Sequence, residues 1–422
     1  MNQPLSRPVD QSVFIRLCVM MFLEFFVWGA WYVTTSTFMT EVGMASKIGL
    51  AYMLCPIAAL ISPFFLGMVA DRFFSSERVL GVLHILGGVF MFLVPAAARS
   101  GPEAFLLVVL AHALCYTPTL GLTNTIGFTH LTNQEKQFPL IRVWGTLGWI
   151  AAGMLIGFVG WDKGPQPYML AGSAGIVLGL FSFALPHTPP PAKGKKATVS
   201  QILGLDALAL FRSPSFVVFA IASFLICIPL AAYYGFAGRM VADLGKSVGS
   251  TMSIGQWCEV VFMFLMPLFF ARLGVKWMLA LGMLAWVVRY ALFAVGAPSQ
   301  MFWMIVLGIG LHGICYDFFF VTGFIYTDKR ATANIRGQAQ GLLVLLTQGL
   351  GLGIGAFLAG ELFNSVVGTT TGGDALPLYQ KFWLYPCLFA LVVLLAFVAL
   401  FKDDSNKPAD SDAKAEEAAA TH

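Results

Sequence analysis

Residues 214–238 read PSFVVFAIASFLICIPLAAYYGFAG and contain no charged side chain. A helix that crosses the hydrocarbon core of a bilayer needs about 20 consecutive, predominantly apolar residues. This stretch meets that requirement, so it predicts a membrane-spanning helix. Comparable apolar blocks lie on both sides of it, and together they decide the fold class of the chain.

The composition of the whole chain supports the same interpretation. Of its 422 residues, 58% are hydrophobic and only 11% are charged, and the mean hydropathy is +0.80. A water-soluble domain of this length cannot hide so much apolar surface behind so few charges. We therefore expect an all-α membrane protein that crosses the bilayer many times.

The apolar residues fall into twelve blocks of helix length, separated by charged or turn-forming residues such as Asp71-Arg72 and Gly101-Pro102. The first block is too long for the core of a signal peptide and lacks a clear cleavage pattern, so we expect it to be retained. The predicted spans are 12–38, 48–70, 79–98, 103–126, 138–160, 168–186, 214–238, 250–271, 276–296, 301–327, 334–362 and 381–401.

The distribution of lysine and arginine predicts the orientation of these spans, because cytoplasmic loops of membrane proteins are enriched in both residues. With the N-terminus in the cytoplasm, the inside segments hold Arg72, Arg78, Lys193, Lys195 and Lys196 among others, whereas the outside loops hold few basic residues. We therefore expect both termini to be cytoplasmic.

A polar segment rich in proline and lysine, from His187 to Arg212, divides the spans six and six. Two such halves are typical of transporters built from structural repeats. Glycines cluster in the fifth and eleventh spans, which predicts close helix packing at matching places in the two halves. The predicted domains are an N-terminal six-helix bundle (1–186), a cytoplasmic linker (187–213), a C-terminal six-helix bundle (214–401) and a disordered, charged cytoplasmic tail (402–422).

Several classes of function find no support in the sequence. The seven cysteines lie in different apolar blocks without close pairs, which argues against disulfides and metal sites. There is no glycine-rich phosphate loop, no spaced His/Cys set and no recognisable nucleophile–base pair, so we expect neither an enzyme nor a cofactor. The net charge of +4 reflects basic residues in loops between spans, so nucleic acid is not an expected partner.

Several motifs resemble one known family. The sequence Gly67-Met-Val-Ala-Asp71-Arg72 after the second span is similar to the conformational loop motif of the major facilitator superfamily. Longer strings, in order along nearly the whole chain, resemble the nucleoside:proton symporter family within it. These strings begin at Trp28, Tyr116, Phe138, Leu203, Ser253, Ala285 and Tyr316.

The resemblance implies the major facilitator fold, with twelve transmembrane helices in two six-helix bundles. It also implies a secondary active transporter in a bacterial inner membrane that imports nucleosides by proton symport through alternating access. Its partners would be a small-molecule nucleoside, a proton and the lipid bilayer, and this fold commonly works as a monomer. An ion gradient rather than ATP would drive the transport.

Five ionisable residues lie well inside the predicted spans: Glu24, Arg142, Glu259, Arg289 and Asp317. A charge at the centre of a bilayer costs about 2.5–3.5 kcal/mol on insertion scales. Each of these residues therefore needs a partner or a function. Arg289 is in the ninth span, which in this fold usually packs on the outside, so we expect a structural or interfacial role for it.

Arg142, Thr146 and Trp149 are spaced by four and three residues, so they share one helical face. A guanidinium, a hydroxyl and an indole suit the hydroxyls of a sugar and a flat base. By position alone, Arg142 is equally compatible with a side chain that extends to the cytoplasmic surface. The resemblance implies that Arg142 and Thr146 bind substrate, and Trp149 stands where we expect phenylalanine in the family.

Gln256 and Glu259 share a face of the eighth span, and both can accept hydrogen bonds from ribose hydroxyls. A structural bond to a neighbouring helix is the alternative, and the resemblance implies substrate contact. Asp317 is a natural proton carrier, because burial favours the neutral form of a carboxylate and a nearby cation favours its charged form. A permanent salt bridge is the alternative for Asp317. Tyr316 is a candidate substrate contact, and His312 stands where we expect tyrosine in the family.

Four further candidates come with alternatives of their own. Glu24 lies one turn before Trp28, where many family members carry an amide, and it is either an extra proton site or a polar contact. Trp28 is a candidate aromatic contact for the substrate, and Asn124 either faces the cavity or bonds to a neighbouring helix. In the seventh span, Tyr233 and Tyr234 can stack on the substrate or hydrogen-bond to it, but the amides that the family can place there as base readers are missing.

Two other functions stay open at this point. The missing amides favour a proton-coupled transporter of the same fold for a sugar or another polyhydroxylated metabolite. A membrane sensor that binds a ligand without transporting it is more remote, because the linker and the tail are too short for an effector domain.

Overall fold

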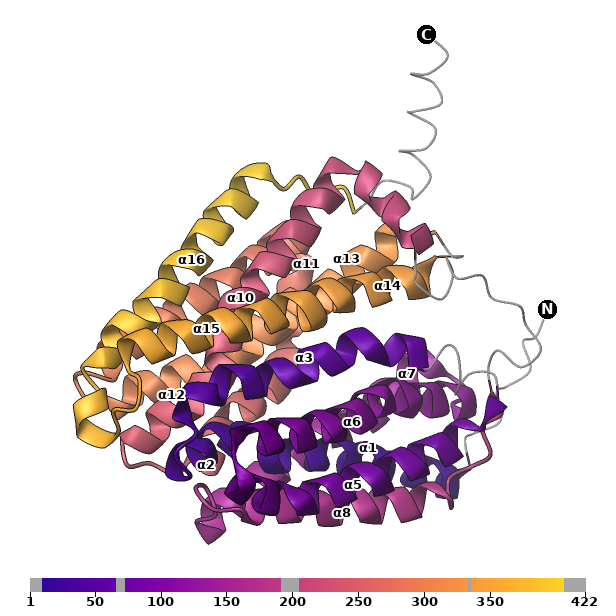
Figure 1. Ribbon diagram of the computed structural model, residues 1–422. Helices are drawn as coiled ribbons and strands as arrows, with labels where there is room; N and C mark the ends of the chain where they lie inside the picture. Colours follow the sequence, from indigo (N-terminus) through magenta and orange to yellow (C-terminus); the bar gives the residue numbers. More distant parts are fainter. Residues whose placement is uncertain (1–9, 66–72, 191–204, 333–334, 406–422) are drawn as a thin grey trace, which may run out of the picture. The chain divides into compact units, whose positions relative to one another are not determined.

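The computed structural model describes residues 10–65, 73–190, 205–332 and 335–405, and the described residues form helices without a strand (Figure 1). The predicted all-α class is therefore confirmed. The predicted loop motif with Gly67, Asp71 and Arg72 lies outside the described residues. So do residues 191–204 of the predicted linker and residues 406–422 of the predicted tail.

The chain divides into two compact units. The first consists of Met1–Lys196 and Lys246–Ser253, and the second of Ala197–Gly245 and Ile254–His422. The long helices of the first unit are α1 (Gln11–Trp31), α3 (Ile48–Phe65), α5 (Ser76–Ser100), α6 (Pro102–His130), α7 (Gln134–Val159) and α8 (Gln166–Ser182). Shorter pieces between them are η1 (Tyr32–Thr34), α2 (Thr35–Glu41) and η2 (Ala45–Lys47).

The second unit contains most of α11 and the remaining helices. Its elements are η4 (Leu205–Arg212), α10 (Pro214–Asp243), α11 (Val248–Gly296), α12 (Phe302–Gly310), η5 (Ile314–Val321), α13 (Thr322–Arg330), α14 (Arg336–Val344), η6 (Leu345–Gly351), α15 (Leu352–Val366), η7 (Gly372–Ala375) and α16 (Leu378–Leu400). The apolar stretch quoted above forms α10. Ser213 caps this helix by accepting a hydrogen bond from the backbone N–H of Phe216, and Pro214 follows at the first helical position.

Ten segments of the described chain are long and apolar enough to cross a membrane. One of them, α11, is a pair of helices, because Gly274 interrupts it with a φ of +65° and a ψ of −176°. Helix α8, with 17 residues, covers most of the predicted span 168–186 and ends at Ser182. Each of the twelve predicted spans therefore coincides with helix in the described part of the chain.

The glycine-rich helices pack closely on the first helix of their own unit. A Cβ atom added to Gly148 of α7 would overlap the carbonyl oxygen of Phe22 in α1. In the second unit, a Cβ atom added to Gly355 of α15 would lie 2.6 Å from the carbonyl oxygen of Ile228 in α10. Small residues permit this approach of helix backbones. The two glycine-rich helices thus make corresponding contacts in the two units, as the glycine pattern predicts.

Two candidate positions lie where the regular α-helix is interrupted. Helix α1 ends at Trp31, three residues after Trp28, and the chain continues as the 3-10 turn η1. The segment η5, Ile314–Val321, is π-helical and contains both Tyr316 and Asp317. π-helical turns are rare and occur frequently at functional sites.

Candidate functional site

The predicted site residues fall into two polar and aromatic clusters, one in each unit. The first-unit cluster is formed by Trp28 of α1, Tyr116 of α6, and Arg142, Thr146 and Trp149 of α7. The second-unit cluster is formed by Tyr233 and Tyr234 of α10, Gln256 and Glu259 of α11, and His312, Tyr316 and Asp317 of α12, η5 and the turn between them. Each cluster is described separately.

An aromatic wall dominates the first-unit cluster. The Trp28 ring centroid lies 5.2 Å from that of Trp149 and 5.8 Å from that of Tyr116, with the first pair edge-to-face. Tyr32 adds a further ring 5.6 Å from Trp28. The indole Nε1 of Trp28 is buried and has no hydrogen-bond partner among the described residues. The wall thus offers flat apolar faces and one free donor.

Arg142 lies beside this wall. Its guanidinium carbon is 4.1 Å from the centroid of the Phe25 ring in α1, a cation–π geometry. A Cβ atom added to Gly145 would lie 2.6 Å from the Phe25 ring and 2.8 Å from Nη1 of Arg142, so only glycine leaves room for this arrangement. In the described part of the chain, no carboxylate forms an ion pair with Arg142. Its donors are therefore available to a ligand, and Thr146 is buried one turn further along α7.

Glu24 has partners that the sequence does not reveal. Its side chain is completely buried, and Oε2 lies 2.7 Å from Nε2 of His84 in α5. Oε1 accepts a hydrogen bond from the hydroxyl of Thr119 in α6 over 2.6 Å, and Tyr116 donates to the backbone carbonyl oxygen of Glu24. Sequence reasoning missed His84, although a histidine inside a predicted span meets the same criterion that singled out Glu24.

His312 connects the members of the second-unit cluster. Its ring stacks on Tyr233 with centroids 5.5 Å apart and an interplanar angle of 21°, and it lies 5.8 Å from the Tyr316 ring. Its Nε2 is 4.0 Å from Oε2 of Glu259, while its buried Nδ1 has no partner among the described residues. Gln256, one turn before Glu259 on α11, is buried, and its Oε1 also has no such partner. The cluster therefore presents acceptors and rings from three helices.

Asp317 is completely buried, and neither carboxylate oxygen has a hydrogen-bond partner among the described residues. Asp317 therefore has no ion-pair partner in the described part of the chain, where a permanent salt bridge is not observed. Its carboxyl group interacts electrostatically with Glu259, and two negative charges there would repel each other. Buried polar atoms without partners are rare in proteins and call for an explanation.

Arg289 lies closer to the second-unit cluster than its place in the ninth span suggests. It is completely buried, its Nε donates to the carbonyl oxygen of Gly308 over 2.9 Å, and its guanidinium carbon lies 4.1 Å from the Tyr233 ring centroid. Its two Nη atoms have no partner among the described residues. Arg289 therefore packs against the Tyr233 ring of the second-unit cluster. The sequence alone did not indicate this contact.

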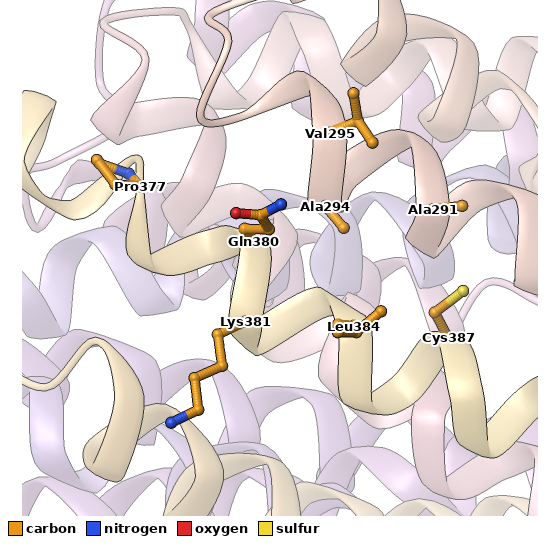
Figure 2. A pocket seen from close by; sticks show the side chains of 8 residues that line it. All are labelled: Ala291, Ala294, Val295, Pro377, Gln380, Lys381, Leu384 and Cys387. Carbon is orange, nitrogen blue, oxygen red and sulfur yellow. The ribbon is translucent and has the colours of Figure 1, made fainter.

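Two features lie apart from these clusters. Asn124 is on α6 and its side chain is exposed. A groove of about 420 Å³ is formed by α16 and the second half of α11, and it is lined mainly by apolar side chains such as Ala294 and Leu384 (Figure 2). Lys381 points away from the α11 side chains of this groove. None of the predicted site residues lines it.

Comparisons with known proteins show the family to which this chain belongs. Residues 11–406 match the profile of the family described as "Nucleoside H+ symporter". The Escherichia coli protein YegT, which carries a provisional assignment as a nucleoside transporter, is 38% identical over 404 residues, 93% of this chain and 94% of YegT. The nucleoside permease NupG of Escherichia coli is 32% identical over 406 residues, 92% of this chain and 96% of NupG.

The fold is also similar to a solved structure. A crystal structure of a variant of the nucleoside transporter NupG matches with a TM-score of 0.85 at 30% sequence identity, and the match covers 92% of this chain and all of the other. The predicted major facilitator fold is thereby confirmed.

Proposed function

Because this chain belongs to the nucleoside H+ symporter family, we propose that it imports nucleosides together with protons and that the two clusters supply the groups for both. It is a multi-pass membrane transporter rather than an enzyme. The relatives are nucleoside carriers, so a sugar as cargo is not favoured despite the missing amides in α10. A sensor that does not transport is not favoured for the same reason.

The observation that carries the proton-coupling proposal is the completely buried Asp317 without a partner among the described residues. An unpaired buried carboxylate is far less costly in its protonated form than in its charged form. Water or a cation that reaches the group in another state of the transporter would favour release of the proton. Glu259, which interacts with Asp317 electrostatically, is the second carboxyl group that we propose for proton transfer in this cluster.

The substrate contacts follow from the chemistry of the groups in each cluster. Arg142 and Thr146 offer donors to the hydroxyls of the ribose, and Gln256 and Glu259 offer acceptors. Trp28 and Trp149 offer faces for a nucleobase. Tyr316, Tyr234 and Tyr233 are the corresponding aromatic groups of the second-unit cluster. We assign no substrate contact to Asn124, because its exposed side chain lies apart from both clusters. These assignments are proposals for binding experiments.

We also propose that both termini are cytoplasmic and that the protein functions as a monomer. The excess of lysine and arginine in alternate loops supports cytoplasmic termini in a bacterial inner membrane. The twelve spans complete the fold within one chain, which supports a functional monomer. The loop motif with Gly67, Asp71 and Arg72 is proposed to act in the conformational change, by resemblance alone.

The test is uptake of labelled uridine and adenosine by cells that lack their own nucleoside carriers, at acidic and at neutral external pH. Protons are cosubstrates, so uptake should rise as the external pH falls and should collapse with a protonophore. Asp317→Asn should abolish this dependence. If the correctly inserted protein moves no nucleoside under any of these conditions, the proposed cargo is wrong.

A further inference from the structure

Glu24 of α1 and His84 of α5 form a buried acid–imidazole pair in the first unit. Glu24 is 0% exposed and His84 is 3% exposed. The distance of 2.7 Å between Glu24 Oε2 and His84 Nε2 is that of a strong hydrogen bond or an ion pair. Two ionisable groups in the interior of a membrane-spanning unit are costly, so their presence points to a function.

The hydroxyl of Thr119 makes this site able to hold a proton without loss of a hydrogen bond. Its Oγ1 lies 2.6 Å from Glu24 Oε1 and 2.5 Å from the carbonyl oxygen of Tyr116. A hydroxyl has one hydrogen and can donate to only one of these acceptors at a time. When Glu24 is ionised, Thr119 donates to Oε1. When Oε1 carries a proton, Glu24 donates to Thr119, and Thr119 turns to the carbonyl oxygen of Tyr116.

His84 completes the site, because Nε2–H donates to Glu24 Oε2 in both of these arrangements. With one added proton, the pair has no net charge, whether that proton is on Glu24 or on His84. Without it, the pair carries one negative charge. The two states differ by one proton, and in both of them each carboxyl oxygen of Glu24 keeps a hydrogen-bond partner, which is the property a reversible proton site requires.

Helices α6, α7 and α8 pack against α1 or α5, α3 packs against α6, and each of these four helices carries titratable or charged groups. From α6, Tyr116 donates to the backbone of Glu24, and His112 interacts electrostatically with His84 while its own Nδ1 lies 2.9 Å from the Gly87 carbonyl oxygen. From α7, the cation of Arg142 lies over the neighbouring ring of Phe25. From α3, Tyr52 and Cys55 are the titratable groups, and α8 has Tyr168 but no charged residue.

Of these groups, only Arg142 carries a permanent charge. On α5 itself, Glu77 and Arg78 precede His84 by about two turns, and Glu77 is bonded to His187 and to the backbone of Thr188. Within α1, Arg16 donates to the carbonyl oxygen of Ala184. No other described residue forms an ion pair with Glu24 or His84.

We propose that Glu24 and His84 form a second proton-binding site, which is loaded and emptied in the transport cycle in addition to Asp317 and Glu259. This proposal rests on the proposed proton-coupled transport. Its consequence is that more protons move with each nucleoside than the carboxyl groups of the second-unit cluster supply.

The first test is the ratio of protons to nucleosides in proteoliposomes with imposed pH and voltage gradients. Glu24→Gln keeps the shape of the side chain and its bonds to Thr119 and His84, but it cannot titrate. This variant, and His84→Gln as a second one, should each move one proton fewer per nucleoside than the wild type. His112→Gln removes a neighbouring buried imidazole that has no carboxylate partner and should keep the wild-type ratio. A wild-type ratio in both Glu24→Gln and His84→Gln would overturn the proposal.

The second test needs no transport. Infrared difference spectra of the purified protein, recorded between acidic and alkaline pH without nucleoside, report the C=O stretch of protonated carboxyl groups. The wild type should show a band that is lost in Glu24→Gln and retained in Asp317→Asn. If this band is present but the protein moves no nucleoside, the proposed function fails and the proton site stands. If the wild type differs from Glu24→Gln and His84→Gln neither in the C=O band of the carboxyl groups nor in the imidazole bands, the proton site is refuted.

Discussion

The imidazole of His312 stacks on the phenol ring of Tyr233 at 5.5 Å, and Arg289 lies against the same phenol at 4.1 Å. The Tyr233 ring is thus in contact with an imidazole and with a guanidinium. Tyr233 therefore links His312, whose Nε2 lies 4.0 Å from Oε2 of Glu259, to Arg289 on the second half of α11.

Asp317→Asn preserves the size of the side chain and removes the carboxyl group that can bind and release a proton. Accumulation of nucleoside driven by an inward proton gradient should fall at least about tenfold, the equivalent of about 1.4 kcal/mol. Exchange of labelled for unlabelled nucleoside without a gradient should persist, because it needs binding but no net proton movement. Measurement of both in the same proteoliposomes separates coupling from binding. Undiminished accumulation in the variant would show that Asp317 is not the coupling group.

Arg142→Lys keeps the positive charge and loses the planar fork of donors. A hydrogen bond to a charged group contributes about 1.5–3 kcal/mol, so the Kd for uridine should rise roughly ten- to hundredfold. Calorimetry on the purified protein measures this directly. Arg16→Lys is the matched control, because Arg16 lies outside the cluster and donates to the Ala184 carbonyl oxygen. Equal affinity in Arg142→Lys and the wild type would exclude a bidentate contact.

Trp149→Ala removes one face of the aromatic wall beside Trp28. Stacking of a base on an aromatic side chain is worth about 1–3 kcal/mol, so nucleoside affinity should fall roughly five- to hundredfold. Trp149→Phe, which restores a smaller ring, should recover much of the loss. Trp144→Ala is the control on the same helix, since Trp144 is 43% exposed and belongs to no cluster. If the alanine and phenylalanine variants bind nucleoside equally well, stacking on Trp149 makes no contribution.

Gly148→Ala tests the close approach of α7 to α1. The added methyl group would overlap the carbonyl oxygen of Phe22, and overpacking of this kind costs about 1–3 kcal/mol. The thermal unfolding temperature of the detergent-solubilised protein should fall. Gly341→Ala should not lower it, because a Cβ atom there meets no heavy atom within 4 Å. Equal unfolding temperatures of Gly148→Ala and Gly341→Ala would mean that the close contact between α7 and α1 does not contribute to the stability of the protein.

The spans could be predicted from the sequence because a membrane helix is recognised by length and hydropathy alone. Even the division of the long helix α11 follows from the polar break between the predicted spans 250–271 and 276–296, where Gly274 adopts its left-handed conformation. The shared face of Arg142 and Thr146 is equally predictable, because helical spacing places both residues on one side of α7.

Partners on different helices could not be predicted in this way. Glu24 and His84 are 60 residues apart, and neither helix encodes the rotation and register that bring their side chains within 2.7 Å. The contact of Arg289 with Tyr233 was missed for the same reason, because a span taken alone does not show which helix its side chains meet. Such pairs depend on packing, and one sequence carries no direct record of it.

The chain passes from the first half of α11 to the second through one non-helical residue, Gly274. Gln256 and Glu259 lie on the first half, and Arg289 lies on the second. A single-residue connection keeps the ends of the two halves together, so a change in the angle between them falls on the φ and ψ of Gly274. The half that carries Gln256 and Glu259 would then change its angle to the half that carries Arg289 at this one residue, which would make Gly274 a hinge within the second-unit cluster.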